Sequence, residues 1–529
     1  MRGVEYVAGA IAMVCACTTA PAFVCSDDSQ CGEGGVCETT GFCSFLDPDC
    51  ESGRRYEPKA GGGYESHCVL PMPGTTTVDS TTQDGSEISS EDEGVDTTGT
   101  DTGPDTTTDD PDGPSITVDS SLRFQTMDGM GIQVWDYAIA SENNWNWRAA
   151  VPAFDDVDLH YAQLITLFFE WEPNNDNDDP LSASVDAFDP SGLIASEDIP
   201  MALFLSDRGY EVSIQKVLMP AWMREDGYEV PPGKYSEFAE SVLTHQIYLE
   251  TAGVPQEFVE ISMVGGETDV FANPADAAEV ARMMLASMES FSINRRLITP
   301  SVPGALADEW FDPWFADAAL ADATIAISVR GVATQDAADF ESVAAWSEVT
   351  GKPVWAYDNW YCGADQGCPA APAEDSTTWA TAWEMAQQNW RLMVHANASR
   401  IYHAAMVGSQ SSIVPETGEK NPTFFVLEHF ANWIPPGSVR VQATSNVPDV
   451  WPVVVERTDG TMSLIVLNTG FVDTEIELRL PSSDIGIVTP PVQSIAGQYV
   501  SEASYEVVDG TISLPLPVNS LTSLHFAHD

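Results

Sequence analysis

The chain has 529 residues, and its 81 acidic side chains outnumber its 21 basic ones to give a formal net charge of -60. A chain of this length can bury several hydrophobic cores, so more than one domain is expected. The charge excludes nucleic acid and anionic membrane surfaces as default partners, because no cluster of Lys or Arg offsets it locally.

Residues 1–22 are typical of an export signal. One basic residue, Arg2, precedes an apolar stretch that is too short to span a bilayer. Its end has two interpretations: cleavage after Ala22, or attachment of lipid at Cys17 in a segment similar to a bacterial lipobox. No later run is long and apolar enough for a transmembrane helix. We therefore expect an extracellular or cell-surface protein that meets a membrane only through a possible lipid anchor.

Residues 23–70 form a predicted disulfide-rich module. Six cysteines in a stretch too small for a hydrophobic core indicate about three disulfides, and their pairing stays open. A zinc site is the competing interpretation, but the stretch lacks Cys-x-x-Cys pairs and has only His67 nearby. The cysteines concerned are Cys25, Cys31, Cys37, Cys43, Cys50 and Cys68.

Residues 71–114 predict a disordered linker. They contain no Lys or Arg and consist mainly of Thr, Ser, Asp, Glu, Gly and Pro. Such a composition cannot bury enough apolar surface to offset the entropy of the chain, and its like charges extend it. We expect a stalk that holds the following domain away from the cell surface.

Residues 115–436 alternate short apolar runs with helix-like segments, which predicts a parallel sheet and, with about eight such units, a closed (β/α)8 TIM barrel. One helix is expected to begin at Asn273 and Pro274, an N-cap followed by proline. Others are expected to end at Gly253 and Gly351. The runs typical of strands are 164–169, 213–218, 258–264, 296–299, 324–329, 353–357 and 400–406.

Residues 437–529 predict a C-terminal all-β sandwich. Short runs rich in β-branched residues are separated by turn sequences such as Asp459-Gly460 and Asp509-Gly510. The fold class is therefore α/β, a barrel followed by a sandwich and preceded by the disulfide-rich module and the linker.

Two barrel strands each lead into a single carboxylate, Glu267 at the end of 259–267 and Asp358 at the end of 353–358. The residues just past the C-terminal ends of barrel strands converge on one pocket. Two carboxylates that face each other across a sugar are the minimum needed to cleave a glycosidic bond. We predict that this pair is catalytic; the alternative is that both are ordinary polar residues where strands give way to loops.

Further side chains near the strand ends are assigned to the same glycan pocket. Aromatic faces stack on sugar rings, which suits tryptophans around one barrel mouth. Glu170 and Glu172 are spare carboxylates that either contribute to the pocket or support its rim by hydrogen bonds. The residues predicted to bind substrate are Trp135, Glu170, Trp171, Glu172, Trp222, Arg330 and Trp360.

The loop after Asp358 is flanked by Cys362 and Cys368. A disulfide between them would hold a loop of the active site, or would only stabilise an exposed loop. Residues 174–179 are rich in oxygen ligands, but they lack the spacing of a calcium loop, and a solvated loop is favoured. There is no G-x-S-x-G, H-E-x-x-H or phosphate-binding glycine motif, so we expect neither a metal nor another cofactor.

Several segments resemble glycoside hydrolase family 30, and the resemblance covers residues 115–529. It implies a retaining clan A enzyme whose barrel packs against a side β-sandwich and which acts on a β-linked glycan. It also implies that Glu267, on the fourth strand, is the acid/base and that Asp358, on the seventh, is the nucleophile. The segments are 124–131, 219–223, 430–440, 464–468 and 516–525.

The chain departs from this pattern at the catalytic positions. Gly266 and Thr268 replace the asparagine and proline that flank the family's acid/base, and Asp358 replaces a glutamate. The shorter side chain matters because retaining enzymes need carboxyl groups about 5–5.5 Å apart and inverting ones about 6.5–9.5 Å. Three outcomes stay open: a rebuilt retaining site, an inverting site, or a catalytically lapsed protein that only binds glycan.

Overall fold

The computed structural model separates the chain into two units, residues 1–106 and 107–529. In the first unit it describes residues 31, 34–37, 43–47, 50 and 54–56. In the second it describes 113–135, 151–168, 171–175, 177, 188, 193–217, 219–224, 229–254, 256–261, 270–271, 273–294, 296–332, 337–360, 378–403, 413, 420–481, 485–495, 498–501, 507–508 and 510–528.

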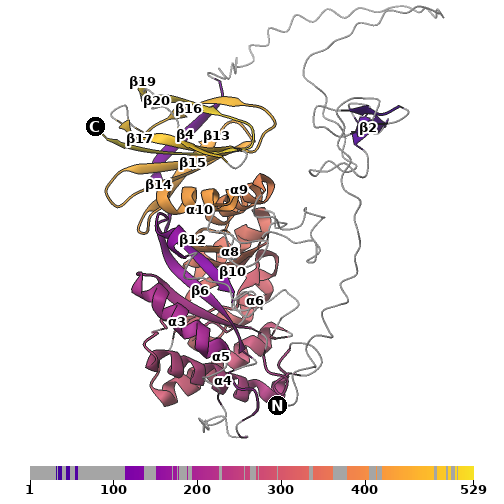
Figure 1. Cartoon of the computed structure of the whole chain (residues 1–529), viewed down its shortest axis with the longest axis vertical. Helices are drawn as coiled ribbons and strands as arrows, with labels where there is room; N and C mark the ends of the chain where they lie inside the picture. The colour runs from indigo at the N-terminus through magenta and orange to yellow at the C-terminus, as the bar shows by residue number, and fades with distance from the viewer. Residues whose placement is uncertain are drawn as a thin grey trace, which may run out of the picture. The chain divides into compact units, whose positions relative to one another are not determined.

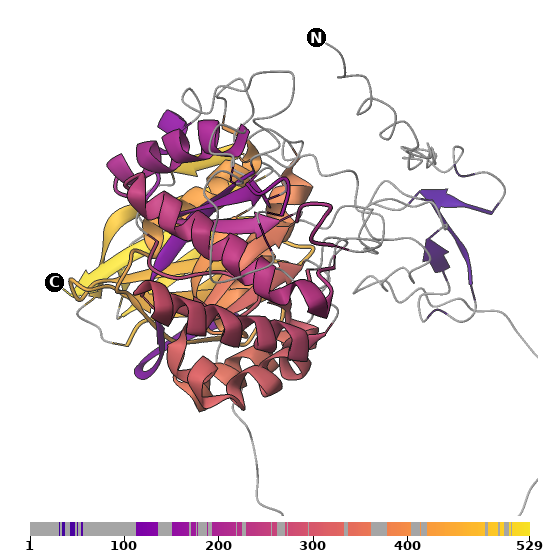
Figure 2. The same cartoon turned by 90° about the horizontal axis from the view of Figure 1, so that it is seen from below.

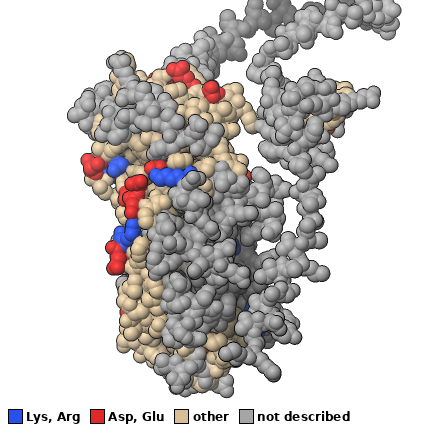
Figure 3. Space-filling view, viewed as in Figure 1, with Lys and Arg blue, Asp and Glu red and all other residues tan. Residues whose placement is uncertain are grey.

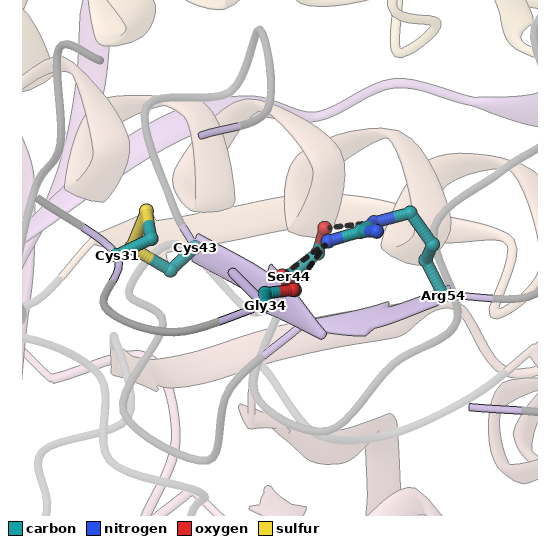
Figure 4. Close-up of a disulfide and its surroundings, with 5 residues drawn as sticks. All are labelled: Cys31, Gly34, Cys43, Ser44 and Arg54. Carbon is teal, nitrogen blue, oxygen red and sulfur yellow. Dashed lines mark hydrogen bonds between the residues drawn. A yellow bond between two sulfur atoms is a disulfide. The ribbon is translucent and has the colours of Figure 1, made fainter. Parts of the chain in front are cut away.

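The first unit contains a small antiparallel sheet in the order β1 (Val36–Cys37), β2 (Cys43–Leu46) and β3 (Arg54–Tyr56). A disulfide joins Cys31 to Cys43, and Cys37 and Cys50 are disulfide-bonded as well. Figure 4 shows this disulfide and, farther along the sheet, Arg54, which donates hydrogen bonds to the Ser44 hydroxyl and backbone oxygen at 2.9 and 2.6 Å. The prediction of disulfides rather than a zinc site is thus confirmed for the described cysteines.

The barrel sheet is parallel. Its order is β7 (Glu211–Val217), β6 (Leu159–Leu167), β5 (Gly129–Trp135), β12 (Ala398–His403), β11 (Val354–Trp360), β10 (Thr324–Val332) and β8 (Leu297–Ile298), and β9 (Val302–Pro303) also pairs with β10. Val259 continues the sheet through a parallel bridge to Leu297, which makes its segment the fourth barrel strand. The predicted parallel barrel is confirmed.

Helices cover the outside of this sheet (Figures 1 and 2). The α-helices are α3 (Leu193–Asp207), α4 (Tyr235–Thr251), α5 (Pro274–Phe291), α6 (Ala307–Phe315), α7 (Ala318–Ala323), α8 (Ala337–Thr350), α9 (Trp379–Val394) and α10 (Pro422–Trp433). The 3-10 helices within the described ranges are η2 (Val151–Phe154), η5 (Pro232–Lys234) and η6 (Gly304–Leu306). None of the helices in the described segments is long and apolar enough to cross a membrane.

The sequence signals at the helix ends are confirmed. The Asn273 side chain accepts a hydrogen bond from the Asp276 backbone N–H at 3.1 Å, and Pro274 is the first residue of α5. Gly253 and Gly351 follow α4 and α8 with φ of 89° and 66°, a conformation that favours glycine because it has no Cβ.

The second sheet of this unit has ten strands in the order β18 (Gln498–Ser501), β17 (Ile485–Ile495), β21 (Ser520–His528), β15 (Met462–Asn468), β14 (Val450–Glu456), β13 (Val439–Ser445), β4 (Ser115–Thr126), β16 (Thr474–Arg479), β20 (Thr511–Leu516) and β19 (Val507–Val508). Leu464 of β15, Ile116 of β4 and Leu514 of β20 share one buried cluster. The sheet therefore folds over on itself as a sandwich, as predicted.

Two features join the sandwich to the barrel. The strand β4 precedes the barrel in sequence but pairs in the sandwich, antiparallel to β13 and parallel to β16. The largest hydrophobic cluster includes Val453, Leu467 and Leu521 of the sandwich together with barrel and helix residues. Figure 1 shows α9 and α10 at this junction.

Candidate active site

The structure describes the predicted site residues unevenly. Glu267, Glu170, Cys362 and Cys368 lie outside the described residues. For Trp135 on β5, and for Asp358 and Trp360 on β11, only the backbone is described. Four predicted residues are described in full: Trp171, Glu172, Trp222 and Arg330.

The backbone of β11 is irregular at Asp358. On one side, Ala356 and Asn359 pair with Ile401 and His403 of β12, so three steps on β11 match two on β12. On the other side, Tyr357 and Trp360 pair with Arg330 and Val332 of β10, with the same mismatch. The strand thus carries one extra residue within 357–359 relative to both neighbours. Such a β-bulge bends a strand and changes the direction of a side chain, and bulges are common beside active sites.

Arg330 lies beside this irregular segment. It is buried near the C-terminal end of β10 and pairs in register with Tyr357, the residue before Asp358. The structure therefore places a predicted substrate-binding cation on the strand next to the candidate nucleophile, at the end of the sheet where barrel enzymes form their sites.

The loops after β6 and β7 meet through Trp222, whose indole N–H donates to the backbone oxygen of Glu172 at 2.7 Å. Glu172 is only 1% exposed, whereas Trp222 is half-buried. Lys234 lies 5.1 Å above the Trp222 ring. Trp222 thus keeps some surface for a ligand, while the burial of Glu172 suits a support of the barrel rim.

Trp171 is 3% exposed. Aromatic rings of Phe188, His245 and Tyr248 lie 5.3, 4.8 and 5.2 Å from its ring, and its N–H donates to Thr244 at 3.3 Å. These contacts occupy the surface that a sugar would need in order to stack.

A hydrogen-bonded network crosses the barrel interior, and the sequence reasoning did not identify it. Gln163 and Gln215 donate to the two carboxylate oxygens of Glu260 at 2.7 and 2.6 Å, and Gln133 donates to Gln163 at 2.6 Å. All four side chains are buried. They connect β5, β6 and β7 to the fourth barrel strand. Within the described residues, β7 forms no backbone pairing with 256–261, so these side chains make the connection there. A glutamine within each of three apolar strands was the available signal.

A second interior cluster surrounds Arg400 on β12. Its guanidinium lies 3.5 and 3.9 Å from the rings of Tyr161 and Trp355 and donates to Glu211 at 2.9 Å. Asp128 lies 4.0 Å from it. These residues are near the N-terminal ends of their strands, the end of a barrel that serves stability rather than catalysis.

Two tyrosines connect the Arg400 cluster to the candidate site. Tyr402 accepts a hydrogen bond from Arg400 at 3.3 Å, and its ring stacks on that of Tyr357 at 4.4 Å. Burial raises the pKa of both tyrosines, so their hydroxyls stay protonated and neutral near pH 7. The residue before Asp358 is therefore packed into a rigid interior. No His, Cys, Asp and Glu side chains of the described segments gather into a group that could hold a metal ion.

No protein-family profile and no curated protein matches the chain. Solved structures do match its fold. An endoxylanase of glycoside hydrolase family 30 from Clostridium papyrosolvens C71 is 17% identical with a TM-score of 0.60, and the match covers 78% of this chain and 100% of that one.

Two further structures have the same arrangement. An endo-β1,6-glucanase, BT3312, is 12% identical with a TM-score of 0.55 over 78% of this chain and 94% of its own. A conserved exported protein from Bacteroides fragilis is 12% identical with a TM-score of 0.59 over 78% and 100%. The chain therefore has the clan A fold of family 30 proteins, as the resemblance in its sequence predicted; at these identities the likeness concerns the fold alone.

Proposed function

We propose that this chain is a glycoside hydrolase that cleaves O-glycosidic bonds of a β-linked glycan by a retaining mechanism. Glu267 is the proposed acid/base and Asp358 the proposed nucleophile. Support comes from a fold otherwise seen in a family 30 endoxylanase and an endo-β1,6-glucanase, and from the position of Asp358 on the seventh barrel strand. A neutral glycan suits the net charge of -60 better than a polyanionic one.

In the proposed reaction Glu267 protonates the leaving oxygen while the Asp358 carboxylate attacks the anomeric carbon to form a glycosyl ester. Glu267 then takes a proton from water, which hydrolyses the ester with net retention. For its first role Glu267 needs a raised pKa, which burial or repulsion from an ionised Asp358 would supply.

The observation that carries the proposal is the extra residue in β11 at Asp358. Aspartate is one methylene shorter than the glutamate of the family, so its carboxylate reaches a substrate only if the backbone compensates. A β-bulge bends the strand locally and can compensate in this way for the shorter side chain. The packed interior below it, from Tyr357 through Tyr402 to Arg400, supports a fixed position for this segment.

The test uses the full chain and a panel of neutral β-linked glucans, xylans and mannans, with release of reducing sugar as the readout. Glu267→Gln and Asp358→Asn should each lower kcat by at least about 1,000-fold, because each removes a group that acts in the transition state. Glu257→Gln is the control. This exposed carboxylate lies 3.6 Å from Arg296 at the start of the fourth strand, and its variant should keep full activity.

Product NMR at early times separates the mechanisms, since a β-anomer formed first indicates retention and an α-anomer inversion. An inverting result would fit carboxyl groups about 6.5–9.5 Å apart and would contradict the nucleophilic role of Asp358. Saturable glycan binding without any sugar release by the wild type would contradict the hydrolase proposal and favour a catalytically lapsed glycan-binding protein.

We also propose that the protein is exported. The export signal predicted for residues 1–22, the disulfide-bonded cysteines of the first unit and the likeness to an exported protein support this location. Fractionation of the producing cell should recover it outside the cytosol, and a cytosolic pool with reduced cysteines would contradict the proposal.

A further inference from the structure

A cavity of about 160 Å³ lies where the sandwich meets the barrel helix α9. Its walls come from strands β4, β13 and β14 and from the C-terminal half of α9, and they include Phe124, Trp390, Val394, Arg440, Gln442 and Val453. Drug-sized ligands occupy pockets of roughly 300–1,000 Å³. A cavity of this size therefore suits one ring or one short chain.

The cavity is remote from the candidate active site. Val394 ends α9, and the next strand, β12, begins at Ala398. The cavity is thus on the side of the barrel where strands start, whereas Asp358 lies near the end of β11. A ligand in this cavity would therefore not touch the residues proposed to cleave the glycan.

The charged group of this cavity is Arg440, which is 6% exposed. Its Nε donates to the Gln125 amide oxygen and its Nη2 to the Asn397 amide oxygen, each at 2.8 Å. Its guanidinium carbon lies 3.8 Å from the centre of the Phe124 ring. Both hydrogen-bond acceptors are neutral, so these contacts fix the guanidinium in place without neutralising it.

No carboxylate of the described residues pairs with Arg440. Burial accordingly lowers its pKa to about 10, with no opposing contribution from an acidic group. Exposed cations of this chain behave differently: Arg123 and Arg208 form ion pairs with Glu456 and Asp155 at 2.7 and 2.6 Å, and the surface in Figure 3 places basic beside acidic side chains. In a chain with so large an excess of acid, a buried arginine without a counterion is unusual.

A buried charge is costly unless an opposite charge or strong hydrogen bonds compensate it. The remaining nitrogen, Nη1, makes no hydrogen bond to a described residue and belongs to a side chain that lines the cavity. An anion in the cavity would form a charge-assisted hydrogen bond there. The wall also includes the apolar side chains of Trp390, Val394 and Val453, which favour an anion with an apolar body over a bare inorganic ion.

We propose that this cavity binds a small organic carboxylate, whose anionic group is held by Arg440 and whose apolar body packs against Trp390 and Val394.

The experiment titrates the full chain with benzoate and with benzamide, its neutral analogue of the same shape, by ligand-observed NMR. Benzoate should bind saturably and at least about tenfold more tightly than benzamide, because only the anion neutralises the guanidinium. Absence of saturable benzoate binding, or equal binding of the two probes, would overturn the proposal.

Two variants locate the binding. Arg440→Leu removes the charge. Gln442→Phe places a large ring on the face of β13 that carries Arg440 and so narrows the cavity while leaving the charge in place. Each should weaken benzoate binding at least about tenfold. Leu122→Ala is the matched control, because this exposed residue lies on β4 but does not line the cavity. If Arg440→Leu does not fold, Gln442→Phe decides. Unchanged benzoate binding in Gln442→Phe would place the site elsewhere and contradict the proposal.

Discussion

Two arginines are buried to nearly the same extent, but only one of them lies beside carboxylates that balance its charge. Arg400, inside the barrel, is 5% exposed and lies within 4.0 Å of both Glu211 and Asp128. Arg440, at the junction with the sandwich, is 6% exposed and donates only to neutral amides. A paired buried charge thus belongs to the scaffold, whereas one without a counterion keeps the capacity to bind an anion.

The largest expected effect is that of removing the paired charge. Arg400→Leu should lower the free energy of unfolding by about 3 kcal/mol, because it leaves Glu211 and Asp128 without a cation. This is the lower end of the range for buried pairs, since both carboxylates are about one-third exposed. Urea unfolding followed by tryptophan fluorescence measures the change.

The control for this variant is the double substitution Arg400→Leu with Glu211→Gln. Glu211→Gln removes one of the two carboxylates that Arg400→Leu leaves without a cation, so the double variant should regain part of the lost stability. A cost below about 1 kcal/mol for Arg400→Leu would show that its ion pairs contribute little to stability and that the two buried arginines do not differ in this respect.

A smaller effect on stability is expected from a basic side chain that is buried in its neutral form. His429 on α10 lies between the hydroxyls of Ser523 and Ser494 at 2.7 and 2.9 Å, and burial lowers its pKa to about 3. The unfolded chain binds this proton below about pH 6.5, but the folded chain does not, so stability falls as the pH falls from there towards 3.

The expected loss from His429 is about 2 kcal/mol between pH 7 and pH 5. His403, whose pKa burial also lowers to about 3, contributes similarly. His429→Gln should therefore remove about half of the combined slope while keeping one side-chain donor and one acceptor for the two serines. Thermal unfolding at pH 7, 6 and 5 measures the slope, and an unchanged slope in the variant would mean that His429 is protonated in the folded state.

The smallest expected effect is that of removing the unpaired charge. Arg440→Leu loses two hydrogen bonds but also removes a desolvated cation, so the net cost should be about 1 kcal/mol or less. The same urea titration measures it. A cost equal to that of Arg400→Leu would mean that Arg440 is chiefly a structural clamp and would remove the distinction between the two regions.

Local signals in the sequence predicted the individual elements well, because caps and turns depend on nearby residues. Asn273 and Pro274 marked the start of α5, and Gly253 the end of α4. The position of β4 could not be predicted in this way. Polar and apolar residues alternate in Ser115–Thr126 as in other exposed strands. Its partner β13 follows the whole barrel in the sequence, so no nearby residue indicates the pairing.

The candidate site was predictable only in part. Strand ends indicated Asp358 and Arg330, and both lie near the C-terminal ends of adjacent barrel strands. The extra residue in β11 is visible only against both neighbouring strands, so no linear pattern reveals it. The Glu260 network likewise required three strands to bring glutamines from distant positions together.

The position of β4 also affects how the protein is made. The ribosome synthesises β4 before the barrel, whereas its neighbours β13 and β16 are synthesised only after the barrel. Ser115 and Asn446, which share a hydrogen bond, are 331 positions apart. Until then β4 is a nascent strand with both edges unpaired, the kind of segment that chaperones protect. Completion of the sandwich therefore follows synthesis of the whole barrel, and a truncation that removes β13 and everything after it would leave β4 without either neighbour.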